Sequence, residues 1–175
     1  MIKIIAGEFK GRKLNNLKID TLRPTQAKVR KSIMDSIRDF NNKVVLDLFA
    51  GIGTLGIEAI SRGAKKVKFV EKNSKIVKIL DKNLDMLCLS DRSEIIRGDV
   101  MSFLDRECQK YDIIFADPPY RNYSFYDLYS PVSNIMNDNG VFCYESEKQD
   151  IREHENIKIK RYGNTQVVLW RKENE

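Results

Sequence analysis

The sequence has very little of the residue types on which several common kinds of site depend. It contains one histidine, His154, and three cysteines, Cys88, Cys108 and Cys143, none of which forms a Cys-x-x-Cys pair. A histidine-based zinc site and a Ser-His or Cys-His nucleophilic site both need more members than this. We therefore expect no metal, and three cysteines in this pattern predict reduced, buried thiols.

Long apolar runs are also absent. No run is long enough to span a bilayer, and the amino terminus carries a charge by Lys3 in place of the apolar core of a signal peptide. No low-complexity linker or internal repeat divides the 175 residues. A chain of this length buries roughly 70% of its unfolded surface, enough for a real core. We predict a cytoplasmic protein with no membrane contact that forms one compact domain and is a monomer.

Acidic residues are scarce in the amino-terminal part. Residues 1–43 hold eleven Lys and Arg against four Asp and Glu, a net +7, whereas the remaining residues hold twenty against twenty-one, a net −1. Such an asymmetry is typical of a solvated face or of a surface that contacts phosphates. We predict that residues 1–43 form a basic extension on a core of residues 44–175.

The pattern within this extension indicates a hairpin followed by a helix. Lys10, Arg12 and Lys13 surround a glycine between two short strand-like runs, which predicts a hairpin with a basic tip. Over residues 26–40 apolar side chains recur at helical spacing, and Thr25 is placed to cap that helix.

A glycine-rich loop joins an apolar strand, residues 44–48, to a helix that begins near Thr54. Gly51 and Gly53 let the backbone approach a ligand, and the helix directs N–H groups at it. The pattern also matches the dinucleotide fingerprint, so the glycines do not separate a nicotinamide cofactor from S-adenosylmethionine. Asp47 favours the second, because a carboxylate attracts its positively charged amino-acid end and repels a pyrophosphate.

Two further carboxylates end the next two predicted strands. Glu71 ends strand 66–71 and is placed to bind the ribose hydroxyls of either cofactor. Asp99 is placed to accept a hydrogen bond from an adenine amino group, to cap the helix of residues 100–104, or to do both. Phe49 is placed either to pack along the cofactor or to fill the core at the end of its strand.

The tetrapeptide Asp117-Pro118-Pro119-Tyr120 follows an apolar run, residues 113–116, that is typical of a buried parallel strand. Two prolines stiffen the turn, Asp117 and the Pro118 carbonyl offer acceptors, and Tyr120 offers a flat face. This combination suits an exocyclic amino group on a planar base. Ligands of open α/β sheets bind outside the carboxyl ends of the strands, so we expect this site and the glycine loop to share one crevice.

In this order the motifs resemble the RsmD family of class I S-adenosylmethionine-dependent methyltransferases, which methylate the N2 of one guanine in small-subunit (16S) ribosomal RNA. The resemblance runs from Lys3 to about Arg171. It departs at Lys31, where an acidic residue is usual, and at Ile33-Met34, where Leu-Phe is usual. The further segments that carry the resemblance are residues 4–7, 11–14, 22–25, 29–30, 56–64, 101–104 and 144–146.

The resemblance implies a Rossmann-like α/β fold, whose seven-stranded, mostly parallel sheet has its last strand antiparallel. The short turn at Gly163-Asn164 also predicts that reversal. The implied catalytic residues are Asp117, Pro118, Pro119 and Tyr120, and the cofactor-binding residues are Thr25, Asp47, Phe49, Gly51, Gly53, Glu71, Asp99 and Val100. For RNA binding we predict Lys10, Arg12, Lys13, Arg23, Lys28 and Arg30.

The implied partner is 16S ribosomal RNA in an assembled or partly assembled small subunit. Three other functions stay open on the sequence. An adenine-N6 methyltransferase acting on DNA or RNA would use the same tetrapeptide, although the chain has no sizeable insertion for target recognition. A protein-glutamine methyltransferase usually has Asn in place of Asp117. A ribosome-assembly factor could bind RNA without catalysis, although the acidic positions are intact.

Overall fold

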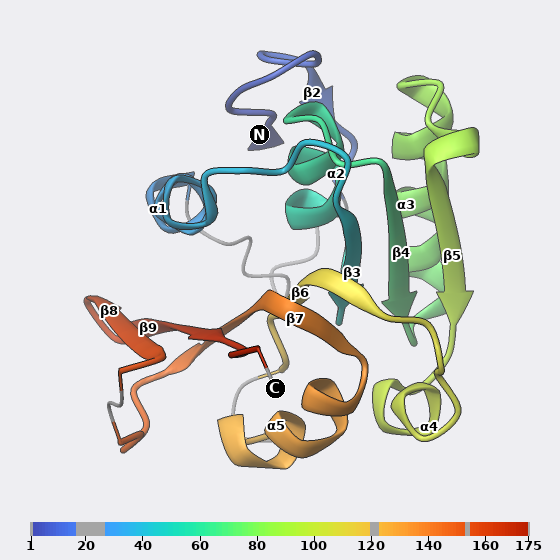
Figure 1. The fold of residues 1–175 in the computed structure, drawn as a ribbon. Coiled ribbons are helices and arrows are strands. Elements are labelled where there is room, and N and C mark those ends of the chain that lie inside the picture. Colours follow the sequence, from blue (N-terminus) through green and yellow to red (C-terminus); the bar gives the residue numbers. More distant parts are fainter. Residues whose placement is uncertain (1, 17–26, 120–122, 153–154, 175) are drawn as a thin grey trace.

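The computed structural model describes residues 2–16, 27–119, 123–152 and 155–174, and these form a sheet covered by helices on both faces (Figure 1). None of the helices in these ranges is long and apolar enough to cross a membrane. The helices are α1 (Ala27–Ile37), α2 (Thr54–Ser61), α3 (Ser74–Met86), α4 (Val100–Leu104) and α5 (Phe125–Asn134), with a 3-10 turn at Ser90–Arg92. The strands are β1 (Ile2–Lys3), β2 (Lys13–Leu14), β3 (Val44–Leu48), β4 (Lys66–Glu71), β5 (Ser93–Arg97), β6 (Tyr111–Ala116), β7 (Met136–Glu147), β8 (Ile157–Tyr162) and β9 (Thr165–Arg171).

The main sheet has seven strands in the order β5-β4-β3-β6-β7-β9-β8. The strands from β5 to β7 pair in parallel, whereas β9 pairs antiparallel with both β7 and β8. The predicted Rossmann-like sheet with its last strand reversed is therefore confirmed. Along the chain, β4 and β5 are added on one side of β3, and β6 is then added on the other side. The topological switch point therefore lies between β3 and β6.

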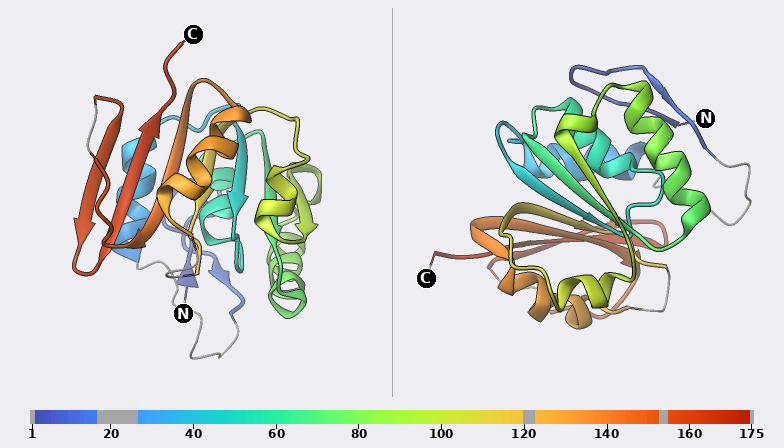
Figure 2. Two further views of the ribbon diagram at one scale, coloured as in Figure 1. Left: turned by 90° about the horizontal axis from the view of Figure 1, so that it is seen from below. Right: turned by 90° about the vertical axis from the view of Figure 1, so that its right-hand side faces the viewer.

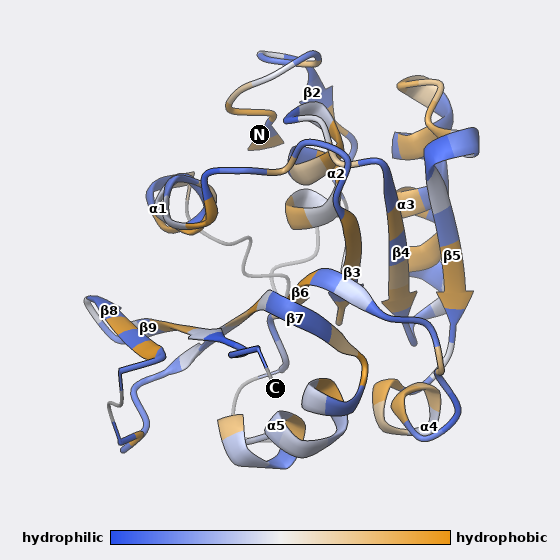
Figure 3. Ribbon diagram, viewed as in Figure 1, coloured by the Kyte–Doolittle hydropathy of each residue, from blue (hydrophilic) through white to orange (hydrophobic). Residues whose placement is uncertain are grey.

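Alternate residues of the central strands enter two separate hydrophobic clusters. Ile113 and Phe115 of β6 pack in a cluster with α1, α2 and α3, while Ile114 and Ala116 pack in a second cluster with α4 and α5. The two views in Figure 2 show the sheet between these layers of helices. Hydropathy follows the same arrangement at the centre of the sheet, where β3 is mostly orange in Figure 3. Burial on both faces explains why β3 and β6 are largely apolar runs in the sequence.

Helix α1 belongs to the same hydrophobic cluster as the core strands through Val29, Ile33, Met34 and Ile37. It is also hydrogen-bonded to the β8–β9 hairpin, because Ser32 Oγ pairs with Tyr162 Oη and Lys160 Nζ donates to Ser36 Oγ at 2.7 Å. The helix of the basic extension therefore packs in one hydrophobic cluster with the core of residues 44–175. At the position where the resemblance departs, Lys31 forms an ion pair with Asp35 at 2.5 Å.

The amino-terminal hairpin of β1 and β2 docks on α2. Glu58 accepts hydrogen bonds from the backbone N–H groups of Ile5 (2.8 Å) and Ala6 (3.0 Å), and the Ser61 carbonyl accepts from Glu8 N (2.7 Å). Gly7 lies so close that an added Cβ would be 1.8 Å from the Ser61 carbonyl oxygen. The contact is therefore specific to a residue without a side chain.

The cysteines differ from the prediction. Cys143 is buried in β7, and burial raises the pKa of its thiol well above the usual value. Cys88 and Cys108 are exposed, so the prediction of three buried thiols is wrong for these two. Both lie in the connections that follow α3 and α4, outside the alternation that buries a strand residue.

Candidate active site

The glycine loop and the Asp117 turn both begin at the switch point. The last residues of β3 and β6 are paired, Leu48 with Ala116, so the loops that follow these two strands leave the sheet side by side. Leu48, which follows Asp47, pairs with Ala116 on one side and with Val70 on the other, so Asp117 and Glu71 lie close to Asp47. Repulsion from both carboxylates adds to the raised pKa of Asp47. Acidic side chains therefore gather at this end of the sheet, which suits a cationic ligand.

The three glycines of the loop serve three different purposes. Gly51 has φ +56°, and a Cβ added to it would meet no atom within 4 Å. At Gly53, with φ +87°, a Cβ would lie 2.4 Å from Leu80 Cδ1, and at Gly56 it would lie 2.3 Å from Phe69 Cε1. Only Gly51 adjoins open space, so the reason given for Gly53 is corrected: its Cβ would clash with the core, while Gly56 allows α2 to approach β4 closely.

Asp47 lies beneath this loop with 2% of its surface exposed. Its Oδ2 accepts a hydrogen bond of 2.8 Å from the N–H of Gly56, inside the first turn of α2. Burial raises the pKa of Asp47 well above its usual value, opposed by the Gly56 hydrogen bond and reinforced by the neighbouring carboxylates. Asp47 therefore holds the start of α2 from beneath the loop, and its role toward the cofactor stays a prediction.

Glu71 joins the end of β4 to the glycine loop. Its Oε2 accepts from Gly51 N at 3.0 Å, and its Oε1 accepts from Asn73 N at 2.7 Å. An ionised carboxylate offers about four acceptor sites, so each oxygen can take a further hydrogen bond. Because the side chain is only partly buried beside Gly51, it fits the role of binding a pair of ribose hydroxyls.

Asp99 caps α4, as the sequence predicts. Its Oδ1 accepts from the N–H groups of Met101 (3.1 Å) and Ser102 (3.3 Å), and Lys72 Nζ lies 3.3 Å from Oδ2. The Ser102 hydrogen bond is the main cause that lowers the pKa of Asp99, and Lys72 adds to it. The contact of Asp99 with adenine stays a prediction. Cofactor binding by Val100 also stays a prediction; this residue is the first of the helix and is buried.

Phe49 has φ +57°, and its ring lies 5.0 Å from that of Tyr123 at an interplanar angle of 46°. It packs against the cluster of α4 and α5 but is only partly buried. The core role proposed for Phe49 is thus partly realised, and its remaining exposed face is at the loop that carries Gly51.

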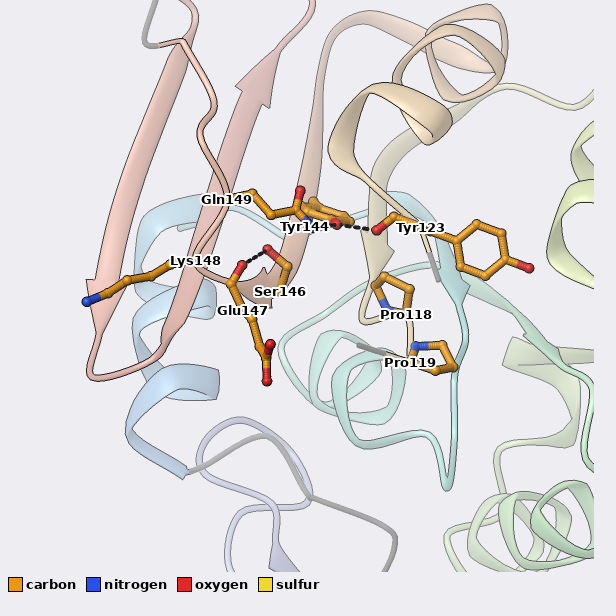
Figure 4. Close-up of a pocket in the computed structure, with 8 residues that line it drawn as sticks. All are labelled: Pro118, Pro119, Tyr123, Tyr144, Ser146, Glu147, Lys148 and Gln149. Atoms are coloured by element: carbon orange, nitrogen blue, oxygen red, sulfur yellow. Dashed lines mark hydrogen bonds between the residues drawn. The ribbon is translucent and has the colours of Figure 1, made fainter. Parts of the chain in front are cut away.

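A pocket of about 210 Å³ lies beside the two prolines. It is bounded by Pro118 and Pro119 after β6 and by the end of β7 (Figure 4). For comparison, an apolar cavity of roughly 150 Å³ holds a benzene molecule. The pocket is large enough for a planar ring, and it adjoins the turn that starts at Asp117. The residues that line it are Pro118, Pro119, Tyr123, Tyr144, Ser146, Glu147, Lys148 and Gln149.

Hydrogen bonds fix the wall opposite the prolines. Tyr144 Oη donates to the Tyr123 carbonyl at 2.7 Å and accepts from Gln149 Nε2 at 3.1 Å. Burial raises the pKa of Tyr144 above its usual value, so the hydroxyl keeps its proton and remains a donor. The sequence assigned no role to these residues, although the position of Tyr144 near the end of a strand beside β6 was a usable signal.

Several predicted residues lie outside the described part of the chain. They are Tyr120 of the tetrapeptide, Thr25 and Arg23. Their roles stay predictions.

The predicted RNA-binding residues fall into two groups. Lys10, Arg12, Lys13 and Lys28 are exposed. Arg30 is 3% exposed and donates through Nη2 to the Lys3 carbonyl at 2.7 Å. Burial lowers the pKa of Arg30, partly offset by Glu58. The prediction that Arg30 contacts phosphate needs correction, because its guanidinium ties α1 to β1 inside the protein.

The hairpin tip lies at the opposite edge of the sheet from Asp117. Arg12 Nη2 donates to the Met86 carbonyl at the end of α3, 3.3 Å away, and α3 leads into the start of β5. Asp117 follows the carboxyl end of β6, which is parallel to β3, β4 and β5. A strand of six residues such as β4 spans about 20 Å, so the tip does not adjoin the pocket.

Comparisons with known proteins identify the family and the fold of this chain. The family model described as Conserved hypothetical protein 95 matches residues 2–171. Ribosomal RNA small subunit methyltransferase D of Haemophilus influenzae is 33% identical over 97% of this chain and 92% of its own length. The solved structure of yhhF from Escherichia coli, named as a candidate methyltransferase, has a TM-score of 0.86 and 29% identity, and covers 99% of both chains.

A more distant structure shares the fold. The methyltransferase candidate SMU.776, which was crystallised with SAH, has a TM-score of 0.69 at 16% identity, and the match covers 93% of this chain and 52% of that one.

Proposed function

The chain belongs to the Conserved hypothetical protein 95 family, which is the RsmD family, and on this premise we propose that it is an S-adenosylmethionine-dependent methyltransferase acting on the N2 of a guanine in small-subunit ribosomal RNA. The observation that carries the proposal is the 33% identity to a ribosomal RNA small subunit methyltransferase over nearly the whole chain. The geometry supports it independently, because the Asp117 turn leaves the sheet beside the glycine loop.

The residues at the switch point fit S-adenosylmethionine. Open space at Gly51, the partly buried carboxylate of Glu71 and the position of Asp117 at the end of β6 suit a ligand with ribose hydroxyls and a cationic sulfonium. The distant relative crystallised with SAH, the product of methyl transfer, supports the same cofactor. When bound, the cofactor supplies an electrophilic methyl group.

The fold also favours this cofactor over a dinucleotide. In the dinucleotide fold the sixth strand continues the parallel sheet. Here the place beside β7 is taken by β9, which is antiparallel. We therefore assign the glycine loop to S-adenosylmethionine.

The protein's task is to orient a weak nucleophile, because the lone pair of a guanine amino group is delocalised into the ring. Asp117 and the Pro118 carbonyl would accept the two N–H bonds, which directs the lone pair away from them. The stacking face is assigned to Tyr120 on the sequence alone. Positioning and electrostatic stabilisation together account for several kcal/mol of barrier reduction. Asp117 or water would take the proton released after transfer.

The target base must leave any duplex to reach this pocket. We propose that the substrate is 16S ribosomal RNA in an assembled or partly assembled small subunit, and that the protein acts on it in the cytoplasm as a monomer. An adenine-N6 methyltransferase would use the same turn, and it is the alternative that substrate assays must exclude. A non-catalytic assembly factor would not need the acidic positions that this chain retains.

The test combines cofactor titration with methyl transfer to small ribosomal subunits, naked ribosomal RNA and DNA, followed by nucleoside mass spectrometry. We expect N2-methylguanosine in ribosomal RNA and no N6-methyladenosine. Asp117→Ala should lose most of the transfer while its affinity for S-adenosylmethionine stays within a few-fold of the wild type. Tyr120→Phe should be nearly silent if stacking is its role. Methylated adenine, or a fully active Asp117→Ala variant, would contradict the proposal.

A further inference from the structure

The β8–β9 hairpin carries a net positive charge, whereas the rest of the core carries a net negative charge. Residues 157–171 contain four Lys and Arg (Lys158, Lys160, Arg161 and Arg171) and no Asp or Glu. Residues 44–175 contain twenty basic and twenty-one acidic residues, so the core without the hairpin has sixteen against twenty-one, a net −5. The net charge of −1 over residues 44–175 is therefore the sum of a basic hairpin and an acidic remainder.

The strand register places part of this charge beside the pocket. Arg161 of β8 pairs with Gln166 of β9, which pairs with Ser146 of β7. Directly paired residues of antiparallel strands share a face of the sheet, so Arg161 and Ser146 lie on the same face. Ser146 lines the pocket, and the separation is two strand spacings, about 10 Å. Arg161 is exposed at this position.

Lys148 adds a second cation at the same edge. Its backbone N–H donates to the carbonyl of Asn164 in the β8–β9 turn at 3.1 Å, which fixes the turn against the pocket wall. The side chain is exposed, and Figure 4 shows its amine directed away from Pro118 and over the hairpin. Lys148 and Arg161, which are distant in sequence, therefore both lie where the β8–β9 turn meets the segment that follows β7.

We propose that Arg161 and Lys148 bind phosphates of the RNA strand that flanks the target nucleotide. The inference rests on the proposed function, and it assigns the substrate backbone to the carboxyl-terminal hairpin. An RNA strand that presents one base to the pocket has its adjacent phosphates near the mouth of the pocket, because the phosphates belong to the same nucleotide, and Arg161 and Lys148 lie on one side of that mouth. Arg161 suits the role, since a guanidinium can donate two parallel hydrogen bonds to one phosphate.

The alternative explanation is that the basic residues on β8 only prevent this edge strand from pairing with a strand of another chain. Lys158 distinguishes the two. It is exposed on the same strand but pairs with Leu169, level with Cys143 in the interior of β7, and so lies farther from the pocket. A role in edge protection would make Lys158 and Arg161 equivalent, whereas phosphate binding would not.

The experiment compares wild type, the double variant Arg161→Ala with Lys148→Ala, and Lys158→Ala, on small ribosomal subunits that lack the modification. We expect the double variant to raise KM about tenfold or more with kcat nearly unchanged. The slope of log KM against log salt should fall by roughly 1.4 to 1.8, at about 0.7 to 0.9 for each lost contact. Lys158→Ala should match the wild type, and Arg161→Lys should recover part of the affinity.

Cofactor affinity and thermal stability should be unchanged in every variant, because exposed charges contribute little to folding. If the wild type methylates the particle and the double variant keeps the same KM and salt slope, this inference is overturned while the proposed function stands. An equal effect of Lys158→Ala would also overturn it. If the wild type transfers no methyl group to RNA, the proposed function itself fails, and this inference fails with it.

Discussion

The space beside Gly51 provides a sharp test of where the cofactor binds. A Cβ added at this glycine meets no protein atom within 4 Å, so the methyl group of Gly51→Ala would project into the open space that we assign to the ligand. The substitution therefore changes the binding site without disturbing the packing. We expect a large loss of affinity for S-adenosylmethionine and a small loss of stability.

The stability cost can be worked out from the backbone. Gly51 has φ +56°, a conformation that costs an alanine roughly 1 to 2 kcal/mol. The substitution also restricts the unfolded chain, which offsets about 0.4 to 1 kcal/mol. The net loss of about 1 kcal/mol lowers Tm by about 2 to 4 °C in a protein of this size. Phe49, at φ +57°, shows that the loop already accepts a side chain in this conformation.

Gly56→Ala is the matched control, because its added Cβ would lie 2.3 Å from Phe69 Cε1 and 2.9 Å from Val67 Cγ1. Both neighbours are fully buried. Overpacking of this kind costs about 1 to 3 kcal/mol, and the gain in helix propensity of up to about 1 kcal/mol offsets only part of it. This variant should lose more stability than Gly51→Ala but retain cofactor affinity while folded.

Thermal unfolding and calorimetric titration with S-adenosylmethionine measure the two effects separately. We expect the two variants to rank in opposite order for affinity and stability. Gly51→Ala should bind the cofactor more weakly, and Gly56→Ala should be the less stable protein. If Gly51→Ala binds the cofactor like the wild type, the space beside this glycine is not the ligand site. If Gly56→Ala loses affinity as strongly while still folded, the loop conformation rather than the open space determines binding.

Three further predictions test the carboxylates and the amino-terminal charge. Glu71→Ala should weaken S-adenosylmethionine binding by about 1.5 to 3 kcal/mol, and an unchanged calorimetric affinity would exclude the ribose contact. The raised pKa of Asp47 means that the folded state binds this proton more tightly than the unfolded state, so its contribution to stability falls as pH rises from the unfolded value of about 3.9 through the folded value. Asp47→Asn should flatten that decline in urea unfolding measured across the pH range, and an unaltered profile would contradict the assignment. Replacing Lys10, Arg12 and Lys13 by Ala should flatten the salt dependence of substrate binding by roughly 0.7 to 0.9 for each phosphate contact, and an unchanged slope with full activity would make this hairpin a solvated face.

Much of the fold was predictable because its signals are local. A parallel strand covered on both faces is a continuous apolar run, and the helix that follows β3 begins at Thr54 as predicted. The shared location of the strand-end carboxylates and the Asp117 turn was predictable in the same way, because the carboxyl ends of parallel strands lie at one edge of the sheet. The pattern of the sequence therefore determined the α/β class and the antiparallel closing hairpin, whereas the seven-stranded sheet was predicted from the family resemblance.

The tertiary structure alone decided which side chains are available at that site. Arg30 and Lys28 are similar in sequence context, yet the packing of α1 buries the first and exposes the second. Gly53 and Gly51 belong to one loop, but only the arrangement of α3 shows that Gly53 faces the core. Charge counts along the chain likewise favoured the amino terminus over Arg161. The register of β7, β9 and β8 brings Arg161 beside the pocket, because backbone hydrogen bonds between strands set neighbours that no spacing along the sequence records.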